Sequence, residues 1–118
     1  MELDAGEHDR LVAAISHLPL LASVGLVEAV AGLDVPGGDW PGAQALASSG
    51  WRDTTRLARG DVTMGTEIAL TNANEIALRL RAYRDRVDEW ISLLETPGGP
   101  DVDAVRDRLA AAKSRLEG

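Results

Sequence analysis

The chain has 118 residues, a formal net charge of −7, no cysteine and 45% hydrophobic residues, none of them phenylalanine. The length predicts one domain, and the absence of cysteine excludes disulfides and thiolate catalysis. The acidic charge argues against nucleic acid as a partner, because binding a phosphate backbone requires clustered cations. An acidic N-terminus and the lack of an apolar run near about 20 residues predict no signal peptide and no membrane span, and hence a cytoplasmic protein.

The first element predicted is a helix over residues 7–31, because Leu11, Ile15 and Leu18 recur at helical spacing after a possible cap at Asp4. Pro19 interrupts it, which predicts a kink near His17 or two abutting helices. Residues 33–41 hold two prolines and two glycines and are expected to form a loop.

Two short helical segments should follow, over residues 42–48 and 51–59. Gly50 is expected to end the first and Gly60 the second, with Asp61 capping the next helix. The longest predicted helix covers residues 64–95, where an apolar seam runs at spacings of three and four residues. Residues 96–100 should form a turn, and Asp101 should cap a final amphipathic helix that reaches Leu116.

These elements predict an all-α protein, a multi-helix bundle with one long helix. No alternation of the β type and no Gly-x-Gly-x-x-Gly after a strand is visible, so we expect no Rossmann sheet in residues 1–118. The seam of the long helix and the many Ala and Gly residues predict self-association, most simply as a homodimer.

Few residues suggest chemistry on their own. The pair His8-Asp9 could belong to a metal site, but too few further ligands exist, so no metal is predicted. His17 lies about two helical turns after Asp9, so the two side chains point to roughly the same side. A lone histidine on an apolar helix is more often a core residue than a functional one.

Three arginines form a more suggestive pattern. Arg52, Arg56 and Arg59 lie at positions i, i+4 and i+7, which places three guanidinium groups on one face of a helix. Guanidinium binds a carboxylate through two parallel hydrogen bonds, so this face could hold an acidic small molecule. The alternative is a solvated face whose arginines pair with Asp53 and Asp61.

Four motifs occur in a fixed order along the chain: His8-Asp9, residues 16–19 (Ser-His-Leu-Pro), residues 50–56 (GWRDTTR) and Asn72. Together they resemble the C-terminal domain of the prephenate dehydrogenases, the NAD(P)-dependent enzymes of tyrosine biosynthesis. The similarity covers about residues 6–94.

The resemblance implies a helical domain like the C-terminal domain of 6-phosphogluconate dehydrogenase, which dimerises by interleaving its long helices. It also implies a substrate cleft shared with a Rossmann domain that binds NAD or NADP. Arg56 matches the arginine that binds a carboxylate of the dicarboxylate substrate, and His17 matches a histidine that lines the cleft. Arg52, one helical turn before Arg56, is predicted to be a further substrate-binding residue. Asp9, Asp53 and Asn72 match supporting positions.

The catalytic histidine of the family, and the serine beside it, belong to the nucleotide domain. The resemblance therefore implies no catalytic residue in this chain. Many members also have a second histidine where this chain has Leu20, and a tryptophan where it has Gly65. Losing that histidine removes a donor near the substrate, which bears on substrate preference.

Three functions follow from these patterns. The chain is expected to be the C-terminal part of a prephenate or arogenate dehydrogenase, active in oxidative decarboxylation only together with a nucleotide-binding domain. The first alternative is a free-standing, non-catalytic dimeric module that binds a carboxylate ligand or acts as a regulator. The second is a small all-α enzyme like a chorismate mutase.

Overall fold

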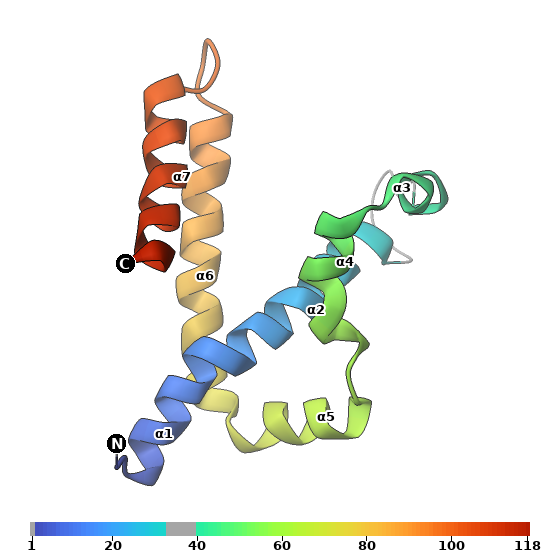
Figure 1. Cartoon of the computed structure of the whole chain (residues 1–118), viewed down its shortest axis with the longest axis vertical. Helices are drawn as coiled ribbons and strands as arrows, with labels where there is room; N and C mark the ends of the chain where they lie inside the picture. The colour runs from blue at the N-terminus through green and yellow to red at the C-terminus, as the bar shows by residue number, and fades with distance from the viewer. Residues whose placement is uncertain (1, 33–39) are drawn as a thin grey trace. The chain divides into compact units, whose positions relative to one another are not determined.

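The computed structural model describes residues 2–32 and 40–118, and these residues form helices connected by turns, with no strand among them (Figure 1). The all-α prediction is confirmed. The helices group into two compact units, Met1–Arg81 and Ala82–Gly118. The assignment of all 118 residues to one domain stays a prediction.

The N-terminal unit is built on a rod of three consecutive segments: α1 (Ala5–Val12), the π-helical turn η1 (Ala13–His17) and α2 (Leu18–Ala31). The Asp4 carboxylate caps α1 by accepting a hydrogen bond from the Glu7 N–H at 2.7 Å. Within η1 the Leu18 N–H donates to the Ala13 carbonyl, five residues back.

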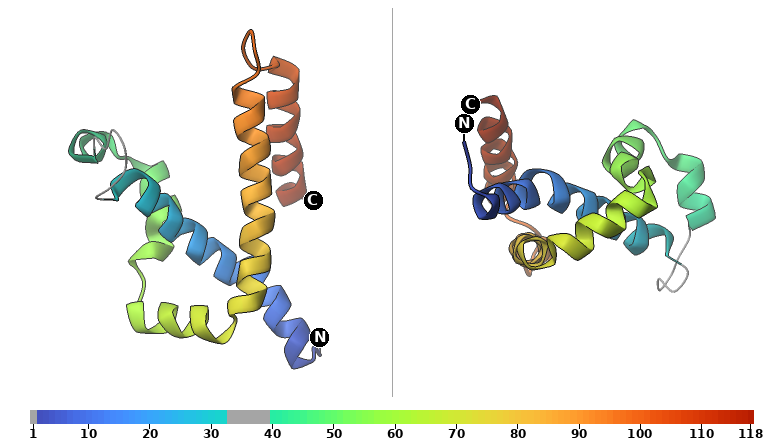
Figure 2. Two further views of the ribbon diagram at one scale, coloured as in Figure 1. Left: turned by 180° about the vertical axis from the view of Figure 1, so that it is seen from behind. Right: turned by 90° about the horizontal axis from the view of Figure 1, so that it is seen from below.

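The predicted break near His17 therefore takes another form. Pro19 has no N–H to donate, and its ring crowds the carbonyl four residues before it. A π-turn relieves that crowding by widening the helix, so the rod continues through Pro19 in one direction (Figure 2).

The continuity of the rod corrects a second expectation. The helical stretch Ala5–Ala31 is 27 residues long and, by length and composition, apolar enough to cross a membrane, although we expected no such run. The sequence argument treated Pro19 as a break, whereas the chain stays helical on both sides of it. Only 11% of the most apolar window is buried within the chain, so most of this surface lacks a partner here.

Two short helices follow, α3 (Trp40–Leu46) and α4 (Ser49–Thr55), and the 3-10 turn η2 (Arg56–Arg59) extends the second. Residues 33–39 of the predicted loop lie outside the described residues, while Trp40 and Pro41 begin α3 rather than end the loop. Gly50 lies inside α4 instead of ending the previous helix. The rings of Trp40 and Trp51 pack at 5.2 Å between centroids, which joins α3 to α4.

A buried pair of hydroxyl groups holds the segment after α4 in place. Ser23 of α2, 4% exposed, accepts a hydrogen bond from the Ala58 N–H of η2 at 3.1 Å. Thr55, 2% exposed, donates to the Trp51 carbonyl at 2.7 Å. The Ser23 bond thus joins η2 to α2, while the Thr55 bond stays within α4, and both buried hydroxyls have hydrogen-bond partners.

The predicted long helix over residues 64–95 is two helices, α5 (Val62–Thr71) and α6 (Ala73–Leu94), separated at Asn72. The Asn72 N–H donates to the Ile68 carbonyl, and its own carbonyl accepts from the Ile76 N–H. Asn72 thus ends one helix and starts the next. Asp61 caps α5, as predicted, by accepting from the Thr63 N–H at 2.8 Å.

The C-terminal unit contains the end of α6, a turn, and α7 (Val102–Glu117), which run side by side in opposite directions (Figures 1 and 2). The turn uses Gly98 and Gly99 at φ of 87° and 102°, a conformation that glycine adopts without strain. The predicted cap at Asp101 is confirmed. Arg108 of α7 lies 4.8 Å from the Trp90 ring centroid and 3.6 Å from the Glu89 carboxylate, joining the two helices.

Neither unit buries much of its apolar surface. Four of the described residues are buried: Ala13, Ser23, Thr55 and Ile76. Sixteen large hydrophobic side chains are exposed, among them Ile15 at 78%, Leu70 at 75% and Leu116 at 90%. Folded domains of this length bury most of their apolar side chains, so these helices need further surfaces to cover them.

We predict that Ser23→Ala destabilises the fold by about 1–3 kcal/mol, because it leaves the Ala58 N–H without its acceptor. The free energy of unfolding, measured by urea denaturation, tests this. Ser114→Ala is the matched control, since Ser114 is exposed on α7 and its loss should change stability by less than about 0.5 kcal/mol. Equal stability of the two variants would contradict the role given to Ser23.

Candidate substrate-binding site

A cavity of about 680 Å³ lies within the N-terminal unit, between α2, η2 and α5. Its wall is mostly aliphatic, from residues such as Leu20, Leu21, Val24 and Ile68. Ser16, Arg56 and Asp61 add polar groups. An apolar cavity with a few polar groups is the usual form of a small-molecule site.

Arg56 is the one arginine among the residues that line this cavity. It is the first residue of η2, and the bond between Ser23 and Ala58 fixes that turn against α2. Within residues 2–32 and 40–118, no carboxylate lies within 4.0 Å of its guanidinium group. Arg56 therefore faces the cavity with no intramolecular ion pair from the described chain, which suits it to bind a carboxylate.

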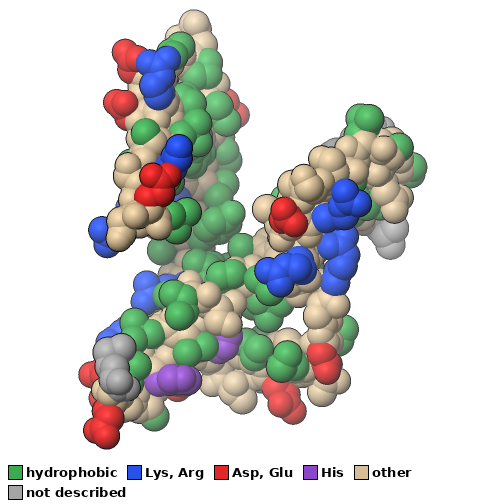
Figure 3. All heavy atoms as spheres, viewed as in Figure 1, with side chains coloured by type: hydrophobic (Ala, Val, Ile, Leu, Met, Phe, Trp, Pro, Cys, Tyr) green, Lys and Arg blue, Asp and Glu red, His purple; other side chains and the backbone are tan. Residues whose placement is uncertain are grey.

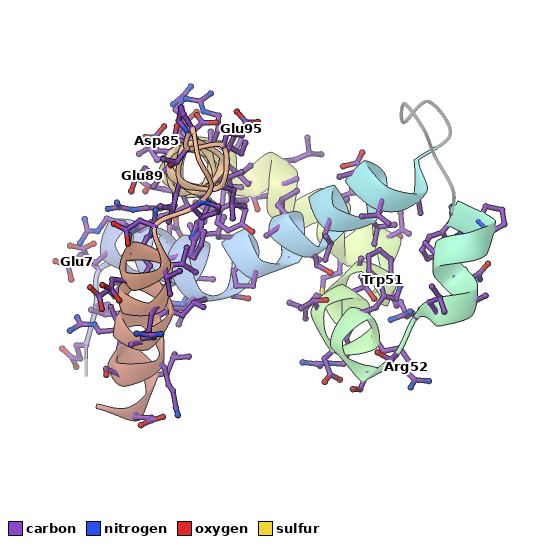
Figure 4. The ribbon with its side chains drawn as sticks, turned by 90° about the horizontal axis from the view of Figure 1, so that it is seen from above. Glu7, Trp51, Arg52, Asp85, Glu89 and Glu95 are labelled. Carbon is purple, nitrogen blue, oxygen red and sulfur yellow. The ribbon has the colours of Figure 1, made fainter. Side chains whose placement is uncertain are left out.

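The three arginines expected on one face have different surroundings. Figure 3 shows Lys and Arg side chains gathered over α4 and the turn after it. The Arg59 guanidinium donates to the Thr55 hydroxyl at 3.1 Å and to the Arg52 carbonyl at 3.4 Å, so it stabilises the turn. Arg52 is exposed on the side of α4 away from α2 (Figure 4), and Asp53 is exposed beside it. In the described structure none of the three arginines forms an ion pair with Asp53 or Asp61. The alternative prediction, in which these arginines pair with those two aspartates, is therefore not supported.

His17, Asn72 and Asp9 form a second cluster. The Asn72 side-chain nitrogen lies 2.9 Å from the Asp9 backbone carbonyl and 3.2 Å from Nδ1 of His17. The contact to Asp9 uses its backbone, whereas its carboxylate is exposed and lies 3.7 Å from Nδ1 of His8. Asn72 thus ties the junction of α5 and α6 to both ends of the π-turn region.

The π-turn helps to align this cluster. Eight residues in a regular helix turn the side-chain direction by about 800°, which would leave His17 about 80° away from the line of Asp9. A π-turn has more residues per turn than an α-helix and therefore rotates each residue less. The wider segment Ala13–His17 therefore turns the His17 side chain closer to the line of Asp9, and the Asn72 amide contacts both the His17 ring and the backbone carbonyl of Asp9.

The predicted site residues accordingly fall in two places. Arg56 lines the cavity, while His17, Asn72 and the Asp9 backbone meet at the helix junction. Neither His17 nor Arg52 is among the described residues that line the cavity. In the described part of the chain, no group of three or more His, Asp and Glu side chains could hold a metal ion.

Leu20 and Gly65, the two departures from the family pattern, lie opposite each other across the cavity. A Cβ added at Gly65 would have the Leu20 Cδ2 as its nearest neighbour, at 4.0 Å. A side chain at position 65 would therefore contact Leu20 at the cavity wall. The shape of this cavity depends on both positions, and its wall at Leu20 is apolar.

Sequence reasoning missed the cavity wall. Ser16 of η1 and Leu20 and Val24 of α2 recur every four residues, and Gly65 and Ala69 do so on α5, so each face could have been recognised. What the spacing does not reveal is that these two faces oppose each other, because that depends on contacts between distant segments.

Gly65→Ala should stabilise the chain by about 0.5–1 kcal/mol, since Gly65 lies inside α5 and the added methyl group makes an ordinary contact. Gly60→Ala should do the opposite, because its Cβ would lie 3.2 Å from the Leu57 carbonyl that accepts the bond from the Gly60 N–H. Thermal unfolding of both variants checks the contrast. A change in unfolding temperature in the same direction for both variants would contradict the placement of Gly65 inside α5 and of Gly60 in the turn before it.

Comparison with known proteins agrees with the resemblance seen in the motifs. The family described as prephenate dehydrogenase, dimerization domain, matches residues 4–110. The prephenate dehydrogenase of Lactococcus lactis subsp. cremoris is 34% identical over 88 residues, which cover 74% of this chain and 24% of that protein. The prephenate dehydrogenase of Bacillus subtilis is 32% identical over 91 residues, covering 77% and 22%. The chain therefore spans about a quarter of the length of these relatives.

Solved structures show the same fold. The Synechocystis arogenate dehydrogenase superposes with a TM-score of 0.77 at 34% identity, covering 93% of this chain and 39% of that one. The A. aeolicus prephenate dehydrogenase, solved with hydroxyphenyl propionate and NAD+, superposes with a TM-score of 0.76 at 21% identity, covering 98% and 38%. These findings do not favour the two alternative functions, the free-standing module and the chorismate mutase-like enzyme. The chain belongs to the prephenate dehydrogenase dimerization-domain family.

Proposed function

We propose that this chain is the dimerisation and substrate-binding part of a prephenate or arogenate dehydrogenase. In this role it binds the dicarboxylate or amino-acid substrate and contributes to a dimer, while another domain carries the nucleotide. The observation that carries the proposal is Arg56, which lines an apolar cavity and has no ion pair with the described chain.

The chemistry of the cavity suits a carbocyclic acid. An aliphatic wall favours the ring, and a guanidinium group at the wall binds a carboxylate through two charge-assisted hydrogen bonds. The chain as a whole carries a net charge of −7, which would repel an anion. The arginines over α4 and η2 form a local positive region that attracts an anionic ligand. Binding of this kind positions the substrate and excludes water from it.

The cofactor is proposed to be NAD or NADP, held mainly by a Rossmann domain outside this sequence. The described residues contain no strand followed by a Gly-rich turn, which is what would receive the pyrophosphate of a dinucleotide. The nicotinamide would accept hydride in the oxidative decarboxylation. The part of this chain is to hold and orient the substrate.

The exposed apolar surface supports a homodimer. Ile15 on the rod, Leu70 on α5 and Leu78 on α6 are each more than half exposed. A second copy that packs its helices against these faces would bury them, as the family's description as a dimerization domain implies. Obligate dimer interfaces of this kind resemble a domain core divided between two chains.

The same proposal interprets the apolar stretch Ala5–Ala31 as part of a dimer core. Core helices of soluble proteins meet the same criteria of length and composition as membrane spans. The cavity uses Ser16, Leu20 and Val24 of this stretch, which requires α2 to pack against η2 and α5. The proposal is therefore that this stretch does not span a membrane, and the cytoplasmic location expected from the sequence stays a prediction.

Isothermal titration of the chain with prephenate and with arogenate tests the site. Arg56→Ala should weaken binding about 10- to 100-fold, the loss expected when a charge-assisted pair of about 1.5–3 kcal/mol is removed. Arg56→Lys should be intermediate, because an ammonium group keeps the charge but not the two-pronged geometry.

Arg115→Ala is the matched control, since it removes the same charge from the exposed end of α7 and should leave the affinity unchanged. Wild-type affinity in Arg56→Ala would overturn the assignment of this residue. If the wild-type chain binds neither acid, it does not hold a preformed substrate site.

A further inference from the structure

The contact between Asn72 and His17 determines which ring nitrogen of His17 carries hydrogen. Asn72 connects α5 to α6 and is half-buried, and its side chain spans 55 and 63 positions of sequence to reach His17 and Asp9. The same amide atom, Nδ2, makes both contacts. The Asp9 contact therefore fixes the orientation of the amide, and the amide in turn decides whether Nδ1 of His17 donates or accepts.

The Asp9 partner is a backbone carbonyl oxygen, which can only accept a hydrogen bond. The Asn72 atom at 2.9 Å from it must be the NH₂ group, because the amide oxygen in that place would oppose a second oxygen. This fixes the orientation of the Asn72 amide independently of His17.

An NH₂ group has two hydrogens and no acceptor capacity toward these partners. One hydrogen is directed to the Asp9 carbonyl, so the other is available for Nδ1 of His17 at 3.2 Å. A hydrogen on Nδ1 would face a hydrogen of the amide, and the contact would be lost. Nδ1 must therefore be the accepting nitrogen, and the hydrogen of a neutral ring must be on Nε2.

We propose that Asn72 is a positioning residue that holds His17 in the tautomer with hydrogen on Nε2. His17 then presents an N–H donor on its far side and cannot accept a proton there as a general base. A ligand oxygen that meets this nitrogen, such as a carboxylate or carbonyl oxygen, would be bound as an acceptor. This role toward a ligand rests on the proposed function, whereas the tautomer itself does not.

The tautomer can be observed directly by long-range proton–nitrogen correlation spectra of the nitrogen-15-labelled chain, recorded at an alkaline pH where imidazole is neutral. The wild-type ring of His17 should show a pyrrole-type shift at Nε2 and a pyridine-type shift at Nδ1. In Asn72→Ala both shifts should move toward the exchange-averaged values of a free histidine side chain, because the ring then loses this contact and keeps only its intrinsic preference for hydrogen on Nε2.

Asn72→Asp makes the sharper test. A carboxylate cannot donate, so it loses the bond to the Asp9 carbonyl, but a carboxylate oxygen within reach of Nδ1 accepts a hydrogen from it. The substitution should therefore draw the hydrogen to Nδ1 and invert the two shifts. Inversion is a new signal that unfolding cannot produce, so this variant stays informative even if Asn72→Ala is unstable. Asn74→Ala is the matched control, because Asn74 is exposed two residues further along and should leave the spectrum unchanged. His8, the other histidine, serves as an internal reference.

A wild-type spectrum with hydrogen on Nδ1 would overturn the proposal, and so would identical His17 shifts in the wild type, Asn72→Ala and Asn72→Asp. Neither His17 nor Asn72 is among the described residues that line the cavity, so Asn72→Ala should leave the affinity unchanged for a ligand that binds in the cavity alone. A ligand that also contacts Nε2 of His17 should bind about two- to ten-fold more weakly in this variant, which corresponds to the loss of one hydrogen bond. Loss of prephenate binding in the wild type, with the tautomer signature intact, would count against the proposed function alone.

Discussion

A shortage of buried surface within the chain is the constraint on which the rest of this structure depends. Its helices are capped and regular, yet four described residues are buried and sixteen large hydrophobic side chains are exposed. Helices of this length gain most of their stability from packing an apolar face rather than from propensity. The fold therefore needs further surfaces to cover the described apolar side chains, and a second copy is the partner that we propose from the family description.

Within the N-terminal unit, a few polar contacts do the positioning that a larger core would otherwise do. Ser23 fixes the turn that carries Arg56, and Asn72 ties the junction of α5 and α6 to the rod at Asp9 and His17. Pro19 follows the π-turn Ala13–His17, and the last residue of that turn, His17, contacts Asn72. These contacts link residues far apart in the sequence, and together they shape the cavity and the cluster beside it.

The sequence predicts the local features of this fold well and its distant contacts poorly. The caps at Asp4, Asp61 and Asp101 were predictable because a capping side chain bonds within its own first turn. The division of the predicted long helix at Asn72 was not, since the spacing of Ala73, Ile76 and Leu80 continues the apolar pattern and the break is held by Asp9 and His17. Likewise, spacing placed three arginines on one face, but only tertiary contacts show that Arg59 stabilises the turn while Arg56 lines a cavity.

The most direct test of the account is whether stability depends on association. Thermal unfolding followed by circular dichroism over a wide range of chain concentrations, with sedimentation equilibrium on the same samples, measures this. If a second copy completes the core, the chain sediments as a dimer and its unfolding midpoint rises with concentration, because a bound partner stabilises only the folded state. A cooperative transition at the same temperature throughout, from a species that sediments as a monomer, would contradict the account.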